Sequence, residues 1–313
     1  MRLSPPSRPR LRGFALVLVA ATALLLVFAA SAFAGAFTPE SGGSPNADKL
    51  DTLYKIVLYA AIVVFVGVEG TLLYSVLRFR ARRRAVPAQI RGNTTLEVGW
   101  TVGAALILVV LTAVTFAYLG GIRNPARSGA HGLPSANGVT YASLDQPAPP
   151  GGRQLKIKVN GQQFVWRYTY PNKAFAYETM IVPVDTTVTL DIESQDVDHS
   201  WWIPQLGPKF DAIPGYVNHT WFKVPASKIP KGKTSVTFRG QCTELCGYGH
   251  ANMVAHVRAV PVDRYEQWLA SQKQSIDQAN QAAVQQRGQF QPIPSPPPPG
   301  AGKEPAEPPI PSP

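Results

Sequence analysis

The 313-residue chain is poor in sulfur, with two cysteines and three methionines, and it has only five histidines. No C-x-x-C-H motif is present, so the chain has no site for a covalently attached c-type haem. Acidic residues are also few, at 19 Asp and Glu against 30 Lys and Arg, which gives a formal net charge of +11. A balance this basic raises the question of nucleic-acid binding.

The positions of the basic residues answer that question. They flank apolar segments near the N-terminus and near residue 80, as seen for Arg2, Arg8, Arg10, Arg12, Arg78, Arg80, Arg82, Arg83, Arg84 and Arg91. Arginines placed beside apolar runs are typical of membrane topology rather than of phosphate recognition. We therefore predict that the chain binds no nucleic acid.

Residues 1–34 have a basic start, an apolar core and small residues at Ala32 and Ala34, which is the pattern of a secretory signal cleaved after Ala34. An uncleaved anchor helix is the alternative. Residues 35–120 are predicted to form a membrane hairpin, because residues 54–77 and 98–119 are each apolar enough to cross a hydrocarbon core of about 30 Å. The Arg-rich loop between them stays in the cytoplasm, so the chain beyond residue 120 is exported.

An ionisable residue, Glu69, lies inside the first predicted span. Such a side chain in a membrane usually faces protein or water. Either Glu69 contacts another membrane subunit, or it is protonated and bonded within the hairpin.

The part of the chain predicted to be exported divides into four segments that differ in composition and periodicity. Residues 121–153 are rich in Gly, Pro, Ser and Ala and are predicted to be a linker. Residues 154–263 include the alternating runs "QLKIKVN", "TVTLDIES" and "SVTFRG", which indicate an antiparallel β-sandwich or barrel. Residues 264–287 are helical in composition, with a weak apolar stripe through Tyr265, Trp268 and Leu269. Residues 288–313 hold 11 prolines in 26 positions and are predicted to be a disordered tail.

The stretch "RGQCTELCGYGHANM", residues 239–253, holds both cysteines together with His250 and Met253. A disulfide, a zinc site and a copper site are the possible interpretations. A disulfide would leave the histidine and methionine unexplained, and zinc sites rarely use a thioether. Copper is favoured, because thiolate and thioether donors stabilise Cu(I) while imidazole tolerates Cu(II).

Two thiolates can bridge a pair of coppers, and each copper then needs a histidine of its own. His250 is one candidate, and the second must come from His131, His199, His219 or His256. We favour His199, because it follows a predicted strand end, where the loops of a β-sandwich commonly present ligands.

The motifs "DVDHSWWIPQLGPKFDAIPG", "GQCTELCGYGHANM" and "NTTLEVGWTV" resemble subunit II of the haem–copper cytochrome c oxidases, and the resemblance spans residues 50–270. It implies a membrane α-helical hairpin followed by an all-β cupredoxin-like barrel with a dinuclear copper centre, CuA. By this resemblance two cysteines would bridge the coppers, with two imidazoles, a thioether and a backbone carbonyl as further ligands: Cys242, Cys246, His199, His250, Met253 and Glu244.

The family accepts electrons one at a time from a c-type cytochrome and passes them to haem a of subunit I, where oxygen is reduced to water and protons are pumped. The resemblance implies a complex with subunit I, and with subunit III, in a bacterial plasma membrane, with the copper domain on the extracytoplasmic side. It also implies that the Glu244 side chain helps to hold magnesium at the subunit I boundary.

Three further residues have two interpretations each. Glu97 resembles the family carboxylate at a proton-path entrance, but it could instead cap the second helix. In "GQQFVWRYTYP", Phe164 stands where the family often has the Trp through which electrons enter, so Phe164 and Trp166 are candidates for electron uptake. A packed aromatic face explains the same pattern.

Residues 151–263 carry 12 Lys and Arg against 9 Asp and Glu. Six acidic residues cluster around the predicted first ligand loop: Asp185, Asp191, Glu193, Asp196, Asp198 and Asp211. A domain that docks a strongly basic cytochrome is expected to be acidic overall. We therefore expect a donor that is weakly basic or tethered in the same membrane. A copper carrier that acts without an oxidase, and a disulfide-bonded binding module, are the alternative functions.

Overall fold

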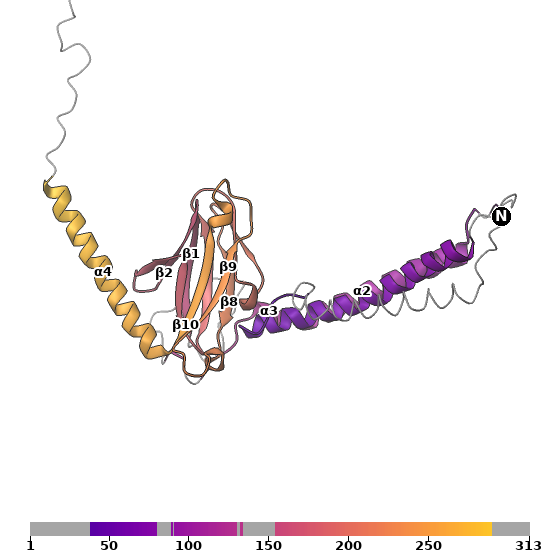
Figure 1. Cartoon of the computed structure of the whole chain (residues 1–313), viewed down its shortest axis with the longest axis horizontal. Helices are drawn as coiled ribbons and strands as arrows, with labels where there is room; N and C mark the ends of the chain where they lie inside the picture. The colour runs from indigo at the N-terminus through magenta and orange to yellow at the C-terminus, as the bar shows by residue number, and fades with distance from the viewer. Residues whose placement is uncertain (1–37, 80–88, 90, 130–131, 134–153, 290–313) are drawn as a thin grey trace, which may run out of the picture.

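The computed structural model describes residues 38–79, 89, 91–129, 132–133 and 154–289. The predicted signal segment, most of the Arg-rich loop, most of the predicted linker and nearly all of the Pro-rich tail lie outside the described residues. Figure 1 shows a long helical pair on one side of a β domain and a single long helix on the other.

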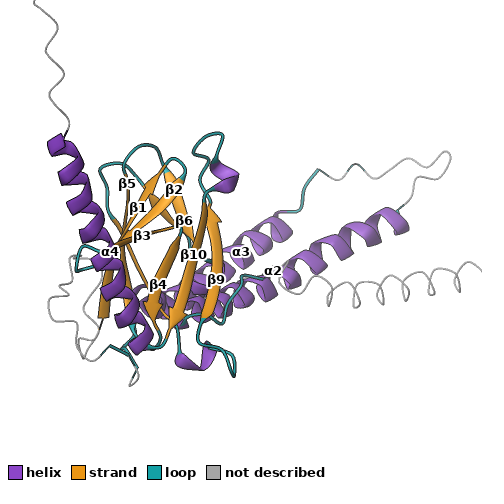
Figure 2. Cartoon of the chain, turned by 60° about the vertical axis from the view of Figure 1, so that its left-hand side comes forward, coloured by secondary structure: helices purple, strands orange, loops and turns teal. Residues whose placement is uncertain are grey.

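The helical pair consists of α2 (Pro45–Arg78) and α3 (Thr94–Arg123), which run side by side (Figures 1 and 2). Both helices are long and apolar enough to cross a membrane, with mean hydropathies of 2.3 and 2.4 over their most apolar stretches, and none of those stretches is buried within the chain. The spans predicted at 54–77 and 98–119 lie inside these helices, and the predicted hairpin is confirmed.

The start of α3 shows why this helix is longer than its apolar run. The side chain of Asn93 accepts a hydrogen bond from the Leu96 backbone N–H (3.2 Å), and the Glu97 carboxylate accepts one from the Asn93 backbone N–H (3.2 Å). These reciprocal bonds satisfy N–H groups that the first turn of a helix leaves without partners. Glu97 therefore acts as a helix cap.

The β domain contains two five-stranded sheets, in the orders β3-β2-β1-β5-β8 and β4-β10-β9-β6-β7. The strands are β1 (Gln154–Gln162), β2 (Val165–Thr169), β3 (Phe175–Tyr177), β4 (Thr179–Pro183), β5 (Thr187–Ser194), β6 (His199–Trp202), β7 (Phe210–Ala212), β8 (Asn218–Lys223), β9 (Val236–Cys242) and β10 (Val254–Val260). The all-β domain predicted from alternation is confirmed.

The prediction of an antiparallel architecture is correct only in part. β1 pairs with β5 in parallel, and β10 pairs with β4 in parallel, while the remaining paired strands are antiparallel. Alternation of apolar and polar residues reports which face of a strand is buried, and it is the same whichever way the neighbouring strand runs. The direction of pairing was therefore not readable from the pattern.

Aromatic side chains fill the space between the sheets. Trp166, Tyr168 and Tyr170 are buried, as expected for one face of β2 and its continuation. Trp201 of β6 donates from its indole Nε1 to the Tyr168 hydroxyl (3.2 Å), which joins the two sheets. Phe164 is only partly buried, since it precedes β2 at the edge of this core. Trp166, Tyr168 and Tyr170 thus form the packed aromatic face considered for this stretch, and Phe164 lies at its edge.

Polar contacts fix the β domain to the helical pair. Asn46 Nδ2 donates to the Trp221 carbonyl (2.8 Å), and Ser44 Oγ accepts from the Lys223 backbone N–H (3.0 Å). At the other helix, Trp221 Nε1 donates to the Ile122 carbonyl (2.9 Å). Ser44 and Asn46 are both 1% exposed. The start of α2 and the end of α3 are therefore both attached to β8.

The last helix, α4 (Val262–Gln289), packs on the β domain through its first turns. Tyr265 is buried, the Trp268 ring lies 5.1 Å from the ring of Tyr170, and Gln272 Nε2 donates to the Phe175 carbonyl (2.9 Å). Beyond these contacts the helix projects away from the sheets (Figure 1). The apolar stripe predicted from the sequence is therefore the part of α4 that packs against the β domain.

Replacement of Tyr265 by alanine should lower the free energy of unfolding of the β domain by about 3 kcal/mol, because a buried aromatic ring is removed from the core. The matched change Tyr265→Phe keeps the ring and removes a hydroxyl that has no partner among the described residues, so it should be neutral or slightly stabilising. Urea unfolding of the detergent-solubilised chain, followed by tryptophan fluorescence, measures both. Equal losses in the two variants would contradict the packing described for α4.

Candidate metal centre

Two free thiols lie together at one end of the β domain. Cys242 is the last residue of β9, and Cys246 lies in the loop that follows; they are 2% and 4% exposed. Their sulfur atoms are 3.9 Å apart, whereas a disulfide bond is about 2.05 Å long. The structure therefore contains a pair of buried thiols in place of the disulfide considered from sequence.

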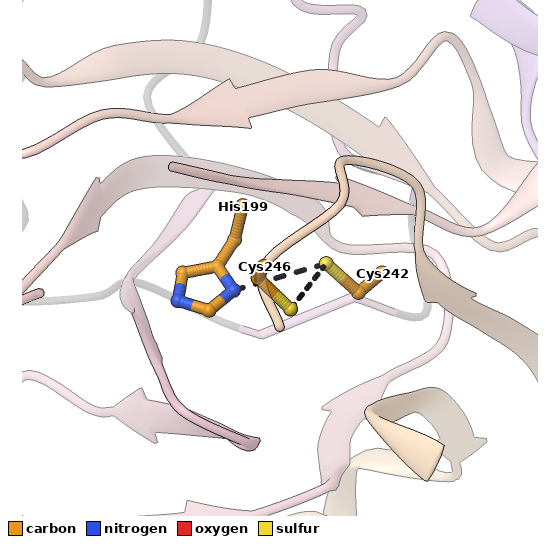
Figure 3. Close-up of side chains that lie close together, drawn as sticks. All are labelled: His199, Cys242 and Cys246. Carbon is orange, nitrogen blue, oxygen red and sulfur yellow. Dashed lines mark hydrogen bonds between the residues drawn. The ribbon is translucent and has the colours of Figure 1, made fainter. Parts of the chain in front are cut away.

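Each thiol has an imidazole beside it. His199 Nδ1 lies 3.8 Å from the Cys242 sulfur, and His250 Nδ1 lies 3.6 Å from the Cys246 sulfur. The Met253 thioether sulfur is 4.0 Å from that of Cys246. Figure 3 shows the His199 ring turned toward the two cysteine sulfurs. The ligand atoms of His199, Cys242 and Cys246 all lie within 4.8 Å of one another. The five donor side chains singled out from sequence thus meet at one place.

The strands and a short loop explain this meeting. β6 begins with His199 and pairs with β9, where Trp201 is opposite Cys242. The Cys242 backbone N–H donates to the Met253 carbonyl (2.9 Å), which closes the loop between them. Within that loop a single 3₁₀ turn, η3 (His250–Asn252), directs His250 and Met253 back toward the sulfurs.

Asp196 positions the His199 ring. Its carboxylate accepts from His199 Nε2 (2.8 Å) and from the backbone N–H groups of Gln163 and Val197 (2.7 Å each). Burial by itself would raise the pKa of Asp196, but these donors outweigh it and bring the pKa below its usual value. A proton on Nε2 leaves the Nδ1 lone pair free to face Cys242. The sequence analysis counted Asp196 only as one of an acidic cluster and missed this role; its place three residues before a ligand was the available signal.

Two glycines leave room for the site. A Cβ atom on Gly161 would lie 2.9 Å from Cδ2 of His199, and one on Gly249 would lie 2.5 Å from Cδ2 of Phe164. Both distances are too short for a carbon–carbon contact. Gly161 therefore lets β1 approach the histidine ring, and Gly249 lets the Phe164 ring lie against the loop beside His250.

The Cys246 thiol would hold its proton without a bound cation. Burial, together with the neighbouring Cys242, raises the pKa of the Cys246 thiol to about 11. A metal ion favours the thiolate form and displaces the proton, so binding of a cation and loss of protons are coupled. The Cys246 thiolate is therefore favoured only with a positive charge beside it.

The donor set fits copper. Metal–thiolate bonds are about 2.3 Å long for zinc, so two sulfurs 3.9 Å apart can be ligands of the same ion. Thiolate and thioether sulfur suit Cu(I), and imidazole suits both oxidation states. Zinc would use the thiolates and imidazoles but has little use for Met253. The His, Cys, Cys cluster is therefore a copper-type site.

The other predicted residues lie at different distances from this cluster. The Glu244 carbonyl accepts from the Cys242 thiol (3.3 Å), while its side chain belongs to an exposed residue. The Trp166 ring is fully buried, 5.8 Å from the ring of His199. Phe164 contacts the ring of Tyr248, with centroids 4.8 Å apart. The sequence analysis did not single out Tyr248.

Three residues considered from sequence lie away from the cluster. His219 is half-buried with Nδ1 2.9 Å from the Asp191 carboxylate, and His256 lies in β10. Glu69 is exposed and borders a groove between α2 and α3 lined by apolar side chains. His131, the remaining histidine, falls outside the described residues.

Comparison with known proteins agrees with these features. A family model described as the periplasmic domain of cytochrome c oxidase subunit II matches residues 175–260, and one described as its transmembrane domain matches residues 32–118. Cytochrome c oxidase subunit 2 of Alkalihalophilus pseudofirmus is 28% identical over 249 residues, covering 77% of this chain and 65% of that protein. Its counterpart in Cereibacter sphaeroides is 29% identical over 279 residues, covering 74% of this chain and 80% of that protein.

A solved structure is also similar. The crystal structure of the periplasmic domain of subunit II of cytochrome oxidase (CoxB) of Bradyrhizobium japonicum shares 33% identity, covers 41% of this chain and 99% of that one, and has a TM-score of 0.36.

A membrane hairpin joined to a two-sheet, cupredoxin-like domain with a copper-type site defines a membrane-bound redox protein. The two family models together match more than half of the chain, and the chain belongs to the cytochrome c oxidase subunit II family. The resemblance found in the sequence is therefore confirmed, as is the prediction that the chain is a subunit of an oxidase.

Substitution of Asp196 by asparagine should weaken copper binding by about 10- to 100-fold, because the residue that fixes the orientation and tautomer of His199 loses its charge. Asp198→Asn, at an exposed carboxylate two residues away, is the matched control and should bind copper as the native chain does. Competition for copper against a soluble chelator measures both affinities. Similar affinity in the two variants would show that Asp196 does not position the histidine.

Proposed function

We propose that this chain is subunit II of a proton-pumping cytochrome c oxidase, which accepts electrons one at a time from a c-type cytochrome and passes them to haem a of subunit I for the reduction of oxygen to water. The observation that carries this proposal is the pair of buried free thiols, 3.9 Å apart, each with an imidazole nitrogen beside it. This geometry suits two metal ions that share both sulfurs. Neither a disulfide nor a single structural zinc requires it.

The proposed ligands follow from the positions of the side chains. Cys242 and Cys246 would bridge the two coppers, His199 and His250 would each bind one, and Met253 would supply a weak thioether. The Glu244 carbonyl beside Cys242 is a further weak donor. A dinuclear copper centre bound there would take up and release single electrons. The chain contributes a buried, preformed cage, which limits rearrangement between oxidation states.

The β domain would lie outside the cytoplasm of a bacterium, at the plasma membrane. The end of α2 that carries Arg78, and the Arg-rich loop after it, would lie on the cytoplasmic side, while the β domain is attached at the opposite ends of α2 and α3. The exposed apolar faces of the two helices would contact subunit I, and subunit III completes the complex. The groove that Glu69 borders is a candidate part of that contact.

Two aromatic residues are proposed for electron uptake. Trp166 lies beside the His199 ring and is fully buried, so it can act only between a surface residue and the metal site. Phe164 is nearer the surface and lies against Gly249, which precedes His250. These positions support a route through the edge of the aromatic core.

Two carboxylates are proposed for roles at the boundary with subunit I and at the cytoplasmic end. The exposed Glu244 side chain would help to hold magnesium at the subunit I interface, because Mg²⁺ prefers oxygen ligands. Glu97, at the end of α3 away from the β domain, would stand at the entrance of a proton path. The same carboxylate accepts a hydrogen bond from the Asn93 backbone N–H and so also caps the helix.

The native chain, purified in detergent with its oxidase, should contain two coppers in this subunit and give a mixed-valence EPR signal shared by both. Cys242→Ser and Cys246→Ser should each abolish that signal and the oxidation of reduced cytochrome, because a bridging thiolate is lost. Copper content and EPR measure the first effect, and oxygen uptake measures the second. A chain that lacks copper and has its cysteines joined in a disulfide would reject the proposal.

The donor is proposed to be weakly basic or tethered in the same membrane. One acidic residue near the ligand loops is paired with a cation, since Lys156 Nζ lies 2.6 Å from the Asp191 carboxylate. Residues 151–263 carry 12 Lys and Arg against 9 Asp and Glu, so the domain offers a strongly basic donor little net attraction.

Electron uptake from the natural donor should consequently depend little on ionic strength, changing by less than about threefold between about 20 and 200 mM salt. Stopped-flow measurement of the second-order rate constant at several salt concentrations checks this. A steep fall with added salt would show that charge steering dominates the encounter.

A further inference from the structure

Large apolar side chains are exposed around the sulfur pair. Tyr248 is 99% exposed and Leu245 is 80% exposed, both in the loop that carries Cys246. Val197, in the loop before His199, is 39% exposed. Single exposed apolar side chains are ordinary, but several around one buried site indicate a contact surface. We call Val197, Leu245 and Tyr248 the apolar rim.

The loops that carry the apolar rim are bonded to one another. Gln163 donates from its backbone N–H to Asp196 (2.7 Å) and from its side chain to the Cys246 carbonyl (2.6 Å). One residue thus joins the loop before His199 to the loop between the cysteines. A surface arranged before binding loses less conformational entropy when a partner docks.

Tyr248 begins a continuous set of contacts from solvent to the sulfurs. Its ring meets that of Phe164 edge to face, with centroids 4.8 Å apart and an angle of 66°. The Phe164 ring lies against Gly249, where an added Cβ would be 2.5 Å away. The next residue, His250, has its Nδ1 3.6 Å from the Cys246 sulfur. Phe164 is therefore the second aromatic group of this path, and Tyr248 is the first.

The charge of the surrounding loops favours one kind of partner. Residues 160–166, 193–199 and 240–253 contain no Lys or Arg, and their charged residues are all acidic: Glu193, Asp196, Asp198 and Glu244. A protein with basic residues around an apolar face would meet no repulsion here. A c-type cytochrome whose haem edge is surrounded by apolar atoms and a few basic residues has this chemistry.

We propose that Tyr248 is the docking residue against which the haem edge of the donor rests, and that the electron enters through Tyr248 and Phe164. The proposal rests on the function proposed above. In the step, the donor haem iron would be oxidised from ferrous to ferric, and copper held by Cys242, Cys246, His199 and His250 would take up that one electron. No proton moves, and no bond is formed or broken.

The test uses the assembled oxidase. Tyr248→Ser should weaken binding of ferric donor cytochrome and lower the second-order rate constant for electron uptake by about tenfold or more, as expected for loss of a central aromatic contact. Tyr248→Phe keeps the ring and should stay within about threefold of the native rate. Because the Tyr248 side chain is almost wholly exposed, either change removes little buried contact, and folding should be preserved.

A matched control is Tyr177→Ser. Tyr177 is 50% exposed and lies on β3, at the edge of the sheet that does not contain Cys242, so docking should be unchanged. In all variants, copper content, the EPR signal and the rate of reduction by dithionite should match the native protein. These measurements report on the metal site without involving the donor.

Native docking and electron uptake in Tyr248→Ser, with full copper, would overturn this proposal alone. Loss of subunit I from a copper-loaded Tyr248→Ser chain would also overturn it, because the apolar rim would then be an interface within the oxidase. A native chain without copper would overturn both this proposal and the proposed function.

Discussion

The backbone hydrogen bond from Cys242 to the Met253 carbonyl is the constraint on which the candidate site depends. It closes the loop after β9, so that the loop must turn back within eleven residues and bring Cys246, His250 and Met253 to the end of the strand. The two cysteine sulfurs are then close enough to bind the same metal ion, and their separation of 3.9 Å is too long for a disulfide bond. Strand pairing with β6 adds His199 from a different part of the chain. Local chain closure and long-range sheet formation each supply part of the donor set.

Residues around the candidate ligands hold the ligand side chains in place. Asp196 orients His199, Gln163 ties that aspartate to the Cys246 carbonyl, and Gly161 leaves the ring its space. These three residues bind no metal in the proposed arrangement. They reduce the number of orientations open to the ligands, which would suit the proposed copper centre, because it would change charge without rearranging. Function and packing are therefore served by the same hydrogen bonds.

The sequence predicted the parts whose signals are local. Long apolar runs predicted α2 and α3, period-two alternation predicted the β domain, and the spacing of soft ligands from Cys242 to Met253 predicted a metal site. His199 required more, because its partner cysteines are more than forty residues away, and it was chosen on a general property of strand ends. The structure places its Nδ1 beside Cys242, while the identity and number of the metal ions stay a prediction.

What escaped the sequence analysis depends on neighbours that no local pattern reveals. The parallel pairing of β1 with β5 joins strands separated by β2, β3 and β4, and alternation is blind to strand direction. The bond of Asp196 to His199 is local, but the Gln163 backbone N–H that also holds this carboxylate comes from a distant part of the chain, just after β1. Tyr248 looked like any polar-aromatic loop residue, and its exposure and its contact with Phe164 appear only in three dimensions.

The hydrogen bonds that join Ser44, Asn46 and Ile122 to β8 have a consequence for how this domain can work. In the described residues, the domain is fastened to both helices at once, so it is held at one position relative to them. Under the proposed function, the span that an electron would cross toward the membrane is then a fixed dimension of the molecule, and only the soluble or tethered donor would have to travel.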